Sequence, residues 1–125
     1  MPTIETTKKI LIIDDDESLG SLLKQKLNKS GMSAVCASDG GQGLDAMNKE
    51  RFDCILLDLK MPIKDGFAVL KSRNATLNAE TPVYVLTSLD EDKCKQALEL
   101  GAKGVMNKIE ISPAQVADRV AKEVA

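Results

Sequence analysis

Acidic side chains stand directly behind two short apolar runs of the chain. Asp14, Asp15 and Asp16 follow the apolar residues 10–13, and Asp58 follows a second such run. Carboxylates that share one site repel each other, so they coexist when a divalent cation lies among them or when one of them is protonated. Oxygen ligands from few protein groups suit Mg²⁺, which keeps several waters and readily accepts a phosphate oxygen. A carboxylate can also act as a nucleophile and form an aspartyl phosphate.

A hydroxyl and a cation follow two further apolar runs, at Thr87 and Lys108. Such groups donate hydrogen bonds to the oxygens of a phosphoryl group. Taken singly, each residue has a simpler interpretation: Thr87 is a hydroxyl at a strand end, Lys108 is solvated, and Asp16 is a helix N-cap. The joint pattern, with each group behind a different strand, favours phosphoryl transfer onto an aspartate.

The composition excludes several other kinds of chemistry. The chain has no histidine among its 125 residues, which removes Ser-His-Asp and Cys-His nucleophiles, zinc sites that contain histidine, and phosphohistidine on this chain itself. The 3 cysteines form no C-x-x-C pair and indicate neither a disulfide framework nor a metal cluster. We therefore expect Cys36, Cys54 and Cys94 to be buried as small apolar side chains.

Charge and hydropathy limit the partners and the location. The formal net charge is -2 and aromatic residues make up 2% of the chain, so neither a basic stripe nor a stacking platform for nucleic acid is indicated. The aliphatic run at residues 10–13 is too short to span a membrane or to form a signal-peptide core. We therefore expect a cytoplasmic protein that binds neither nucleic acid nor membranes.

The elements that must position these residues alternate between short apolar strands and amphipathic helices. Strands are predicted at residues 9–13, 34–37, 54–57, 82–86 and 105–106, and each is followed by a helix. Strands without polar alternation are typical of a parallel sheet that is buried on both faces. In such a doubly wound α/β fold, sites form outside the carboxyl ends of the strands. We expect one domain over residues 8–125, preceded by a flexible tail at residues 1–7.

Helix ends are also marked in the sequence. Asp65 and Asp90 are predicted to cap the helices that follow them, and Ser112 with Gln115 forms a capping box. Gly31 and Gly101 are placed where helices stop. The apolar stripe of the first helix is predicted to comprise Leu19, Leu22, Leu23 and Leu27.

The motifs together resemble the receiver domain of two-component response regulators. The resemblance covers residues 8–124 and rests on residues 10–15, 53–62, 65–67, 81–88 and 101–108. It implies a five-stranded, flavodoxin-like sheet of strand order 2-1-3-4-5 with helices on both faces.

The resemblance also implies a role for each candidate residue. Asp58 would accept a phosphoryl group from the phosphohistidine of a sensor kinase or a phosphotransfer protein. Asp15, Asp58 and the backbone carbonyl of Lys60 would bind Mg²⁺, and Asp14 would assist through a water. Thr87 and Lys108 would bind the phosphoryl oxygens. The chain would then be no enzyme beyond phosphorylation and dephosphorylation of its own Asp58.

Two positions depart from the pattern of the family. Receivers usually carry Tyr or Phe on the fifth strand as a rotameric switch, whereas this chain has Val105, and Tyr84 on the fourth strand cannot simply replace it. The family's Lys-Pro pair is here Lys108-Ile109. A cis bond before Ile costs about 2.5–4 kcal/mol, so we expect this peptide to be trans.

The leading hypothesis is a stand-alone receiver of the chemotaxis or phosphorelay type, because the chain ends within its last helix. It would contact a downstream protein through the helix after Asp90, the strand at residues 105–106 and the helix after Ser112. One alternative is a degenerate receiver that docks partners without phosphorylation, which Val105 keeps open. A less favoured alternative is a small phosphohydrolase with an aspartate nucleophile.

Overall fold

Strands and helices alternate along the whole described chain. The computed structural model describes residues 7–59, 61, 65–88 and 91–125. Its elements are β1 Lys9–Ile13, α1 Glu17–Lys29, β2 Ser33–Ala37, α2 Gly40–Lys49, β3 Cys54–Leu57, α3 Gly66–Arg73, β4 Val83–Thr87, α4 Glu91–Glu99, β5 Gly104–Asn107 and α5 Pro113–Val124.

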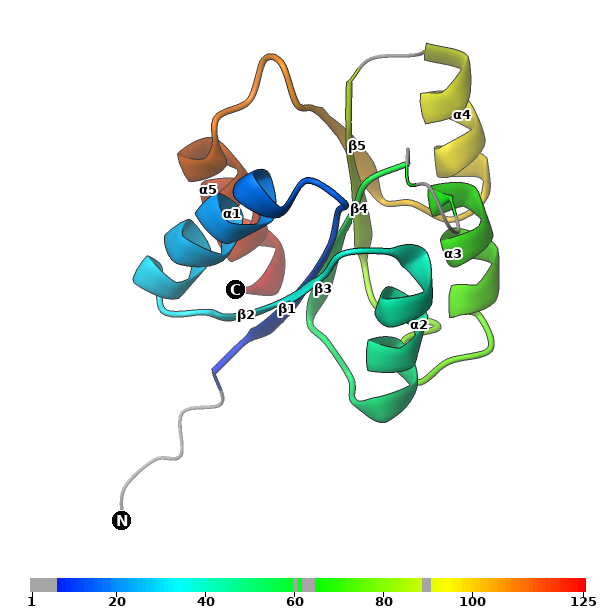
Figure 1. Cartoon of the computed structure of the whole chain (residues 1–125), viewed down its shortest axis with the longest axis horizontal. Helices are drawn as coiled ribbons and strands as arrows, with labels where there is room; N and C mark the ends of the chain where they lie inside the picture. Colours follow the sequence, from blue (N-terminus) through cyan, green and yellow to red (C-terminus); the bar gives the residue numbers. More distant parts are fainter. Residues whose placement is uncertain (1–6, 60, 62–64, 89–90) are drawn as a thin grey trace.

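The strands form one parallel sheet of 5 strands in the order β2-β1-β3-β4-β5. Helices α1 and α5 cover one face of the sheet, and α2, α3 and α4 cover the other (Figure 1). This is the doubly wound flavodoxin-like architecture that the alternation and the resemblance predicted. All four strand pairs are parallel, so the carboxyl ends of all five strands lie at the same edge.

Strand β1 shows why the apolar runs do not alternate with polar residues. Leu11 and Ile13 pack into a cluster on the face of α2, α3 and α4. Ile10 and Ile12 pack into a second cluster on the face of α1 and α5. All four side chains are 0–1% exposed, so each face of this central strand is covered by a helical layer.

Side-chain caps fix where the helices begin. The carboxylate of Asp65 accepts a hydrogen bond from Ala68 N–H at 2.9 Å, which confirms the predicted start of α3. Ser112 and Gln115 form the predicted capping box of α5, whereas the cap predicted at Asp90 lies outside the described residues. The two glycines at the helix ends adopt positive φ, +87° at Gly31 and +107° at Gly101, as a left-handed helix stop requires.

The burial predicted for the cysteines is wrong at two positions. Cys54 is buried, but Cys36 is exposed and Cys94 is partly exposed. Cys36 lies on β2, an edge strand that has a neighbour on one side only. In α4, which carries Cys94, only Ala97 is buried.

One member of the predicted stripe on α1 is also misplaced. Leu23 and Leu27 are buried and Leu19 packs against them in part, but Leu22 is 47% exposed. The stripe is narrower than predicted because α1 contacts the sheet through one face only. Apart from Thr7, the tail predicted at residues 1–7 lies outside the described residues. Within the described ranges, no helix combines the length and apolar character needed to cross a bilayer.

Candidate functional site

Backbone hydrogen bonds continue past the strand ends and hold the candidate residues in place. The N–H of Asp14 donates to the carbonyl of Ala37 at 3.1 Å, and the N–H of Asp58 donates to the carbonyl of Ile13 at 2.9 Å. At the other side of the site, the N–H of Lys108 donates to the carbonyl of Thr87 at 2.9 Å. These hydrogen bonds position the main chain from which the side chains of Asp14, Asp58 and Lys108 extend.

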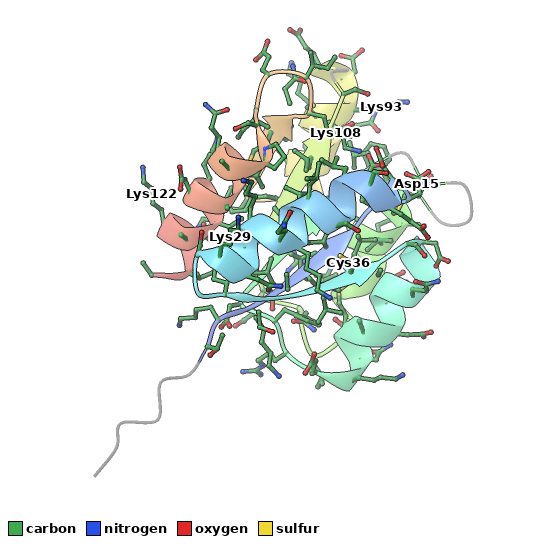
Figure 2. All side chains as sticks on the ribbon, turned by 60° about the vertical axis from the view of Figure 1, so that its left-hand side comes forward. Asp15, Lys29, Cys36, Lys93, Lys108 and Lys122 are labelled. Atoms are coloured by element: carbon green, nitrogen blue, oxygen red, sulfur yellow. The ribbon has the colours of Figure 1, made fainter. Side chains whose placement is uncertain are left out.

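Three carboxylates meet at the carboxyl edge of the sheet. One oxygen each from Asp14, Asp15 and Asp58 lies within 4.8 Å of the others. Asp14 and Asp58 are 5% exposed, whereas Asp15 is open to solvent. Figure 2 shows Asp15 and Lys108 at the same end of the molecule, where α1 begins and β5 ends.

The Lys108 ammonium bridges the two buried carboxylates. Its Nζ lies 2.9 Å from Oδ2 of Asp14 and 3.3 Å from Oδ2 of Asp58. Burial by itself would lower the pKa of Lys108, but the hydrogen bond to Asp14 and the charges of Asp14 and Asp58 together raise its pKa. Lys108 is therefore held protonated at the centre of the site.

Asp14 and Asp15 differ in what their carboxylates can still bind. Oδ1 of Asp14 accepts a hydrogen bond from Asp16 N–H at 2.9 Å, and its Oδ2 faces Lys108. Both oxygens of Asp14 therefore already contact protein donors, while Asp15 faces solvent. Asp16 caps α1 by accepting from Leu19 N–H at 3.1 Å, as its simpler interpretation predicted.

Thr87 lies at the end of β4 beside the site. It is 5% exposed, and its hydroxyl donates to the carbonyl of Ser88 at 3.3 Å. The Lys108–Ile109 peptide is trans, as expected, since no cis peptide bond occurs among the described residues.

Val105, which replaces the aromatic residue usual in the family, and Tyr84 lie on opposite faces of the sheet. Val105 packs in part against the cluster on the face of α2, α3 and α4. Tyr84 packs against the cluster on the other face, where its hydroxyl donates to Glu123. Tyr84 therefore cannot take the place of an aromatic side chain at position 105.

The donor set fits a magnesium ion. Three carboxylates and one ammonium leave a formal charge of two negative units among these side chains, which a single divalent cation neutralises. All the side-chain ligands are oxygens, as Mg²⁺ prefers. The carbonyl of Lys60, the remaining predicted ligand, lies outside the described residues.

The fold and this constellation place the chain in a known family. Residues 10–121 match the family model "Response regulator receiver domain". The chain belongs to this family, whose members are phosphoacceptors in two-component signalling. Receiver domains bind Mg²⁺ at a cluster of aspartates, and they interact with sensor kinases or phosphotransfer proteins and with downstream effectors.

Two curated relatives come from Bacillus subtilis (strain 168). The chain is 40% identical over 114 residues to the alkaline phosphatase synthesis transcriptional regulatory protein PhoP, covering 90% of this chain and 47% of that protein. The chain thus spans about half the length of PhoP. It is also 40% identical over 96 residues to sporulation initiation phosphotransferase F, covering 76% of this chain and 77% of that protein.

Solved receiver structures are similar over nearly the whole chain. Chemotaxis protein CheY4 of Vibrio cholerae has a TM-score of 0.86 at 27% identity, covering 94% of this chain and 98% of that chain. The receiver domain of the Francisella response regulator 1452 has a TM-score of 0.84 at 30% identity, covering 94% of this chain and 97% of that chain.

The structure brings the predicted side chains Asp14, Asp15, Asp58 and Lys108 together and places Thr87 at the neighbouring strand end. Sequence analysis did not anticipate that Lys108 would pair with Asp14 as well as lie near Asp58. That pairing depends on strand order, because β1 and β5 are separated by β3 and β4 in the sheet. The sequence indicated Lys108 by its position behind the last strand and by the resemblance over residues 101–108, but neither indicated the contact with Asp14.

Proposed function

We propose that Asp58 is the phosphoacceptor of this receiver domain, which we take to span residues 8–125. The observation that carries the proposal is the convergence of Asp58 with two further carboxylates, within 4.8 Å, and with Nζ of Lys108 at 3.3 Å. Asp58 is buried directly after a central strand, where its N–H donates to the carbonyl of Ile13. A fixed nucleophile beside a fixed cation suits in-line transfer of a phosphoryl group.

The proposed donor is a phosphohistidine of a sensor kinase or a phosphotransfer protein. A carboxylate oxygen of Asp58 forms a bond to phosphorus while the nitrogen–phosphorus bond of the donor breaks. The electron pair of that bond returns to the imidazole nitrogen. The chain has no histidine, which agrees with a role as acceptor rather than donor.

Other residues of the site stabilise the group that is transferred. Asp15 and Asp58, with the carbonyl of Lys60, would hold Mg²⁺, and Asp14 would contact it through a water. The ion, when bound, supplies positive charge that offsets the carboxylates and the phosphoryl oxygens. Lys108 and Thr87 would donate to the phosphoryl oxygens, a charge-assisted contact in the case of Lys108.

We place the downstream partner on the surface formed by α4, β5 and α5. Support comes from β5, an edge strand that leaves this side of the sheet without a neighbouring strand. The outer residues of α5, such as Asp118 and Arg119, are exposed beside β5. Val105 carries no aromatic ring, so a rearrangement after phosphorylation would not use the rotamer of an aromatic side chain at this position.

Labelling with a small donor tests the assignment of Asp58. The protein is incubated with acetyl phosphate, with and without Mg²⁺, and its intact mass is measured. We expect one phosphate adduct that requires Mg²⁺ and is absent from Asp58→Ala, while Asp53→Ala serves as the matched control and labels like the wild type. An adduct that persists in Asp58→Ala, or that forms equally well in the presence of a chelator, contradicts the proposal.

Labelling, together with a measurement of phosphate release from small phosphate esters, separates the two alternatives. A receiver that only docks partners acquires no adduct under any condition. A phosphohydrolase releases phosphate steadily from small esters, whereas a receiver turns over only its own aspartyl phosphate. The family assignment favours neither alternative.

A further inference from the structure

Gly66, the first residue of α3, lies directly against the peptide that follows Asp58. A Cβ atom at Gly66 would be 2.6 Å from the carbonyl oxygen of Asp58 and 2.7 Å from Cα of Leu59. Optimal contacts of this kind are about 3.5–4.0 Å, so no side chain fits here. The N–H of Gly66 also donates to the carbonyl of Leu59 at 3.0 Å. The backbone at the start of α3 therefore packs directly against the backbone of Asp58 and Leu59.

Space alone explains this glycine. Among the described glycines, only Gly31 and Gly101 have positive φ, so the backbone of Gly66 has a conformation that any residue can adopt. Glycine is needed at position 66 because two stretches of main chain approach too closely for a Cβ.

The obstacle at Gly66 differs from those at two other crowded glycines. A Cβ at Gly43 would be 2.6 Å from Cδ1 of Ile13, and one at Gly104 would be 2.8 Å from the ring of Tyr84. Those neighbours are side chains, and they differ in their freedom to move. Ile13 is 0% exposed and its carbonyl accepts a hydrogen bond from Asp58 N–H, whereas Tyr84 is partly exposed. The two nearest neighbours of Gly66 are main-chain atoms of Asp58 and Leu59, and the N–H of Asp58 is already bonded to the carbonyl of Ile13.

Extra volume at position 66 must therefore displace the Asp58–Leu59 peptide or the start of α3. Displacing the peptide moves the Asp58 carboxylate relative to Lys108, whose Nζ lies 3.3 Å from Oδ2 of Asp58. A shift of about 1 Å in a reacting group can slow a reaction by about 100-fold.

We propose that Gly66 is a positioning residue for phosphorylation: by allowing α3 to close directly on the Asp58–Leu59 peptide, it sets where the acceptor carboxylate stands relative to Lys108. The kinetic part of this inference rests on the proposed role of Asp58 as the acceptor. The structural part, that Gly66 fixes the position of the Asp58–Leu59 peptide, does not depend on that role.

The test compares Gly66→Ala with Gly104→Ala, which adds the same methyl group against the partly exposed ring of Tyr84. Both are labelled with acetyl phosphate and Mg²⁺, and the rate constant is taken from intact-mass time courses. We expect the rate constant to fall by about 10- to 100-fold in Gly66→Ala and to stay within about threefold in Gly104→Ala. Circular dichroism gives the folded fraction of each variant. If either variant is partly unfolded, sucrose is added to both, because sucrose stabilises the folded state.

Two further measurements separate positioning from a loss of packing. Backbone amide NMR shifts of Asp58 and Leu59, recorded without donor or metal, are expected to move in Gly66→Ala and not in Gly104→Ala. The double variant Leu59→Ala/Gly66→Ala removes the nearby Cδ2 of Leu59 but leaves both backbone contacts. We expect it to label as slowly as Gly66→Ala, whereas recovery of the wild-type rate would mean that side-chain crowding is the cause.

The outcomes distinguish this inference from the proposed function. Equal labelling rates in the two alanine variants, or unmoved amide shifts in Gly66→Ala, overturn the positioning role. A Gly66→Ala protein that stays unfolded in sucrose also overturns it, because the cost would then be global rather than local. If the wild type acquires no adduct at Asp58, the proposed function fails, and the NMR comparison alone decides whether Gly66 fixes the peptide.

Discussion

Neighbouring aspartates at the end of β1 have different surroundings and should have different roles. Asp14 is buried, and both of its carboxylate oxygens contact protein donors, the N–H of Asp16 and the ammonium of Lys108. Asp15 is exposed and belongs to the carboxylate cluster, and Asp16 accepts the hydrogen bond that starts α1. Only Asp15 combines a place in the cluster with access to solvent, which makes it the side chain best placed to receive a metal from solution.

We expect Asp15→Asn to weaken Mg²⁺ binding by about tenfold or more, since it removes one of few charged ligands and about 1.4 kcal/mol corresponds to a factor of ten. Asp16→Asn is the matched control, because Asn caps a helix about as well as Asp and keeps stability within about 0.5 kcal/mol. Titration calorimetry measures both affinities, and urea unfolding measures both stabilities. Equal losses of Mg²⁺ affinity would mean that the two carboxylates do not divide these roles.

At the scale of elements, the sequence predicted what local patterns determine. The core of every strand, the stop signals at Gly31 and Gly101, and the capping box at Ser112 all agree with the structure. The burial of Cys36 was predicted wrongly because it was inferred from the apolar residues around it, although the strand order implied by the resemblance already leaves β2 at an edge. The convergence of the candidate residues was predictable because the carboxyl ends of parallel strands lie at the same end of the sheet. The contacts of Lys108 with Asp14 and Asp58 were not predictable, because the sequence does not give the distances between those strand ends.

A second element-scale feature was not predicted. The hydroxyl of Tyr84 on β4 donates to Glu123 on α5, and Lys103 forms an ion pair with the same carboxylate at 2.8 Å. The guanidinium of Arg119 lies 5.9 Å from the centre of the Tyr84 ring. Glycine at position 104 leaves room for that ring, since a Cβ there would be 2.8 Å from it. This contact fastens the last turns of α5 to the sheet.

The hydrogen bond to Glu123, followed by partial burial, raises the pKa of Tyr84 from 10.0 to about 12. The neutral phenol therefore contributes stability that is fully present below pH 10.0 and is lost as the pH rises through about 12. Tyr84 is the only tyrosine and the chain has no tryptophan, so phenolate absorbance reports on this residue alone. We expect a native midpoint near 12 and a midpoint near 10.0 in urea.

Glu123→Gln is the matched variant for this titration, and we expect it to move the native midpoint of Tyr84 toward 10.0. Circular dichroism at each pH verifies that the fold persists while the phenol titrates. A wild-type midpoint near 10.0 in folded protein would show that the contact with Glu123 does not hold in solution.

At the scale of the whole molecule, the two ends of the sheet carry different kinds of polar group. The carboxyl end gathers a cluster of carboxylates with one ammonium, whereas the amino end holds a network of hydrogen bonds from side chains to the backbone around Asn78, which is 0% exposed. Its amide donates to the carbonyls of Met47 and Glu50 at 2.8 and 2.9 Å and accepts from Phe52 N–H at 2.7 Å. Arg73 completes this end by donating to the carbonyl of Thr81 at 2.9 Å and to that of Asn78.

Because these two groups of residues lie at opposite ends of the sheet, we expect that a substitution at the amino end can lower the stability of the fold while phosphorylation at the carboxyl end continues. Asn78→Ala removes the partner of two buried backbone groups, the carbonyl of Met47 and the N–H of Phe52, and of the part-buried carbonyl of Glu50. Each buried group left without a partner costs about 1–3 kcal/mol, so we expect the free energy of unfolding to fall by about 3 kcal/mol or more. The labelling rate of the folded fraction should stay within about twofold, because distant sites with no shared contacts act independently. Asn74→Ala, an exposed position at the end of α3, is the control and should change stability by less than about 0.5 kcal/mol. Urea unfolding and labelling with acetyl phosphate measure the two quantities. A labelling rate that falls in step with stability, after correction for the unfolded fraction, would show that the two ends of the sheet are coupled.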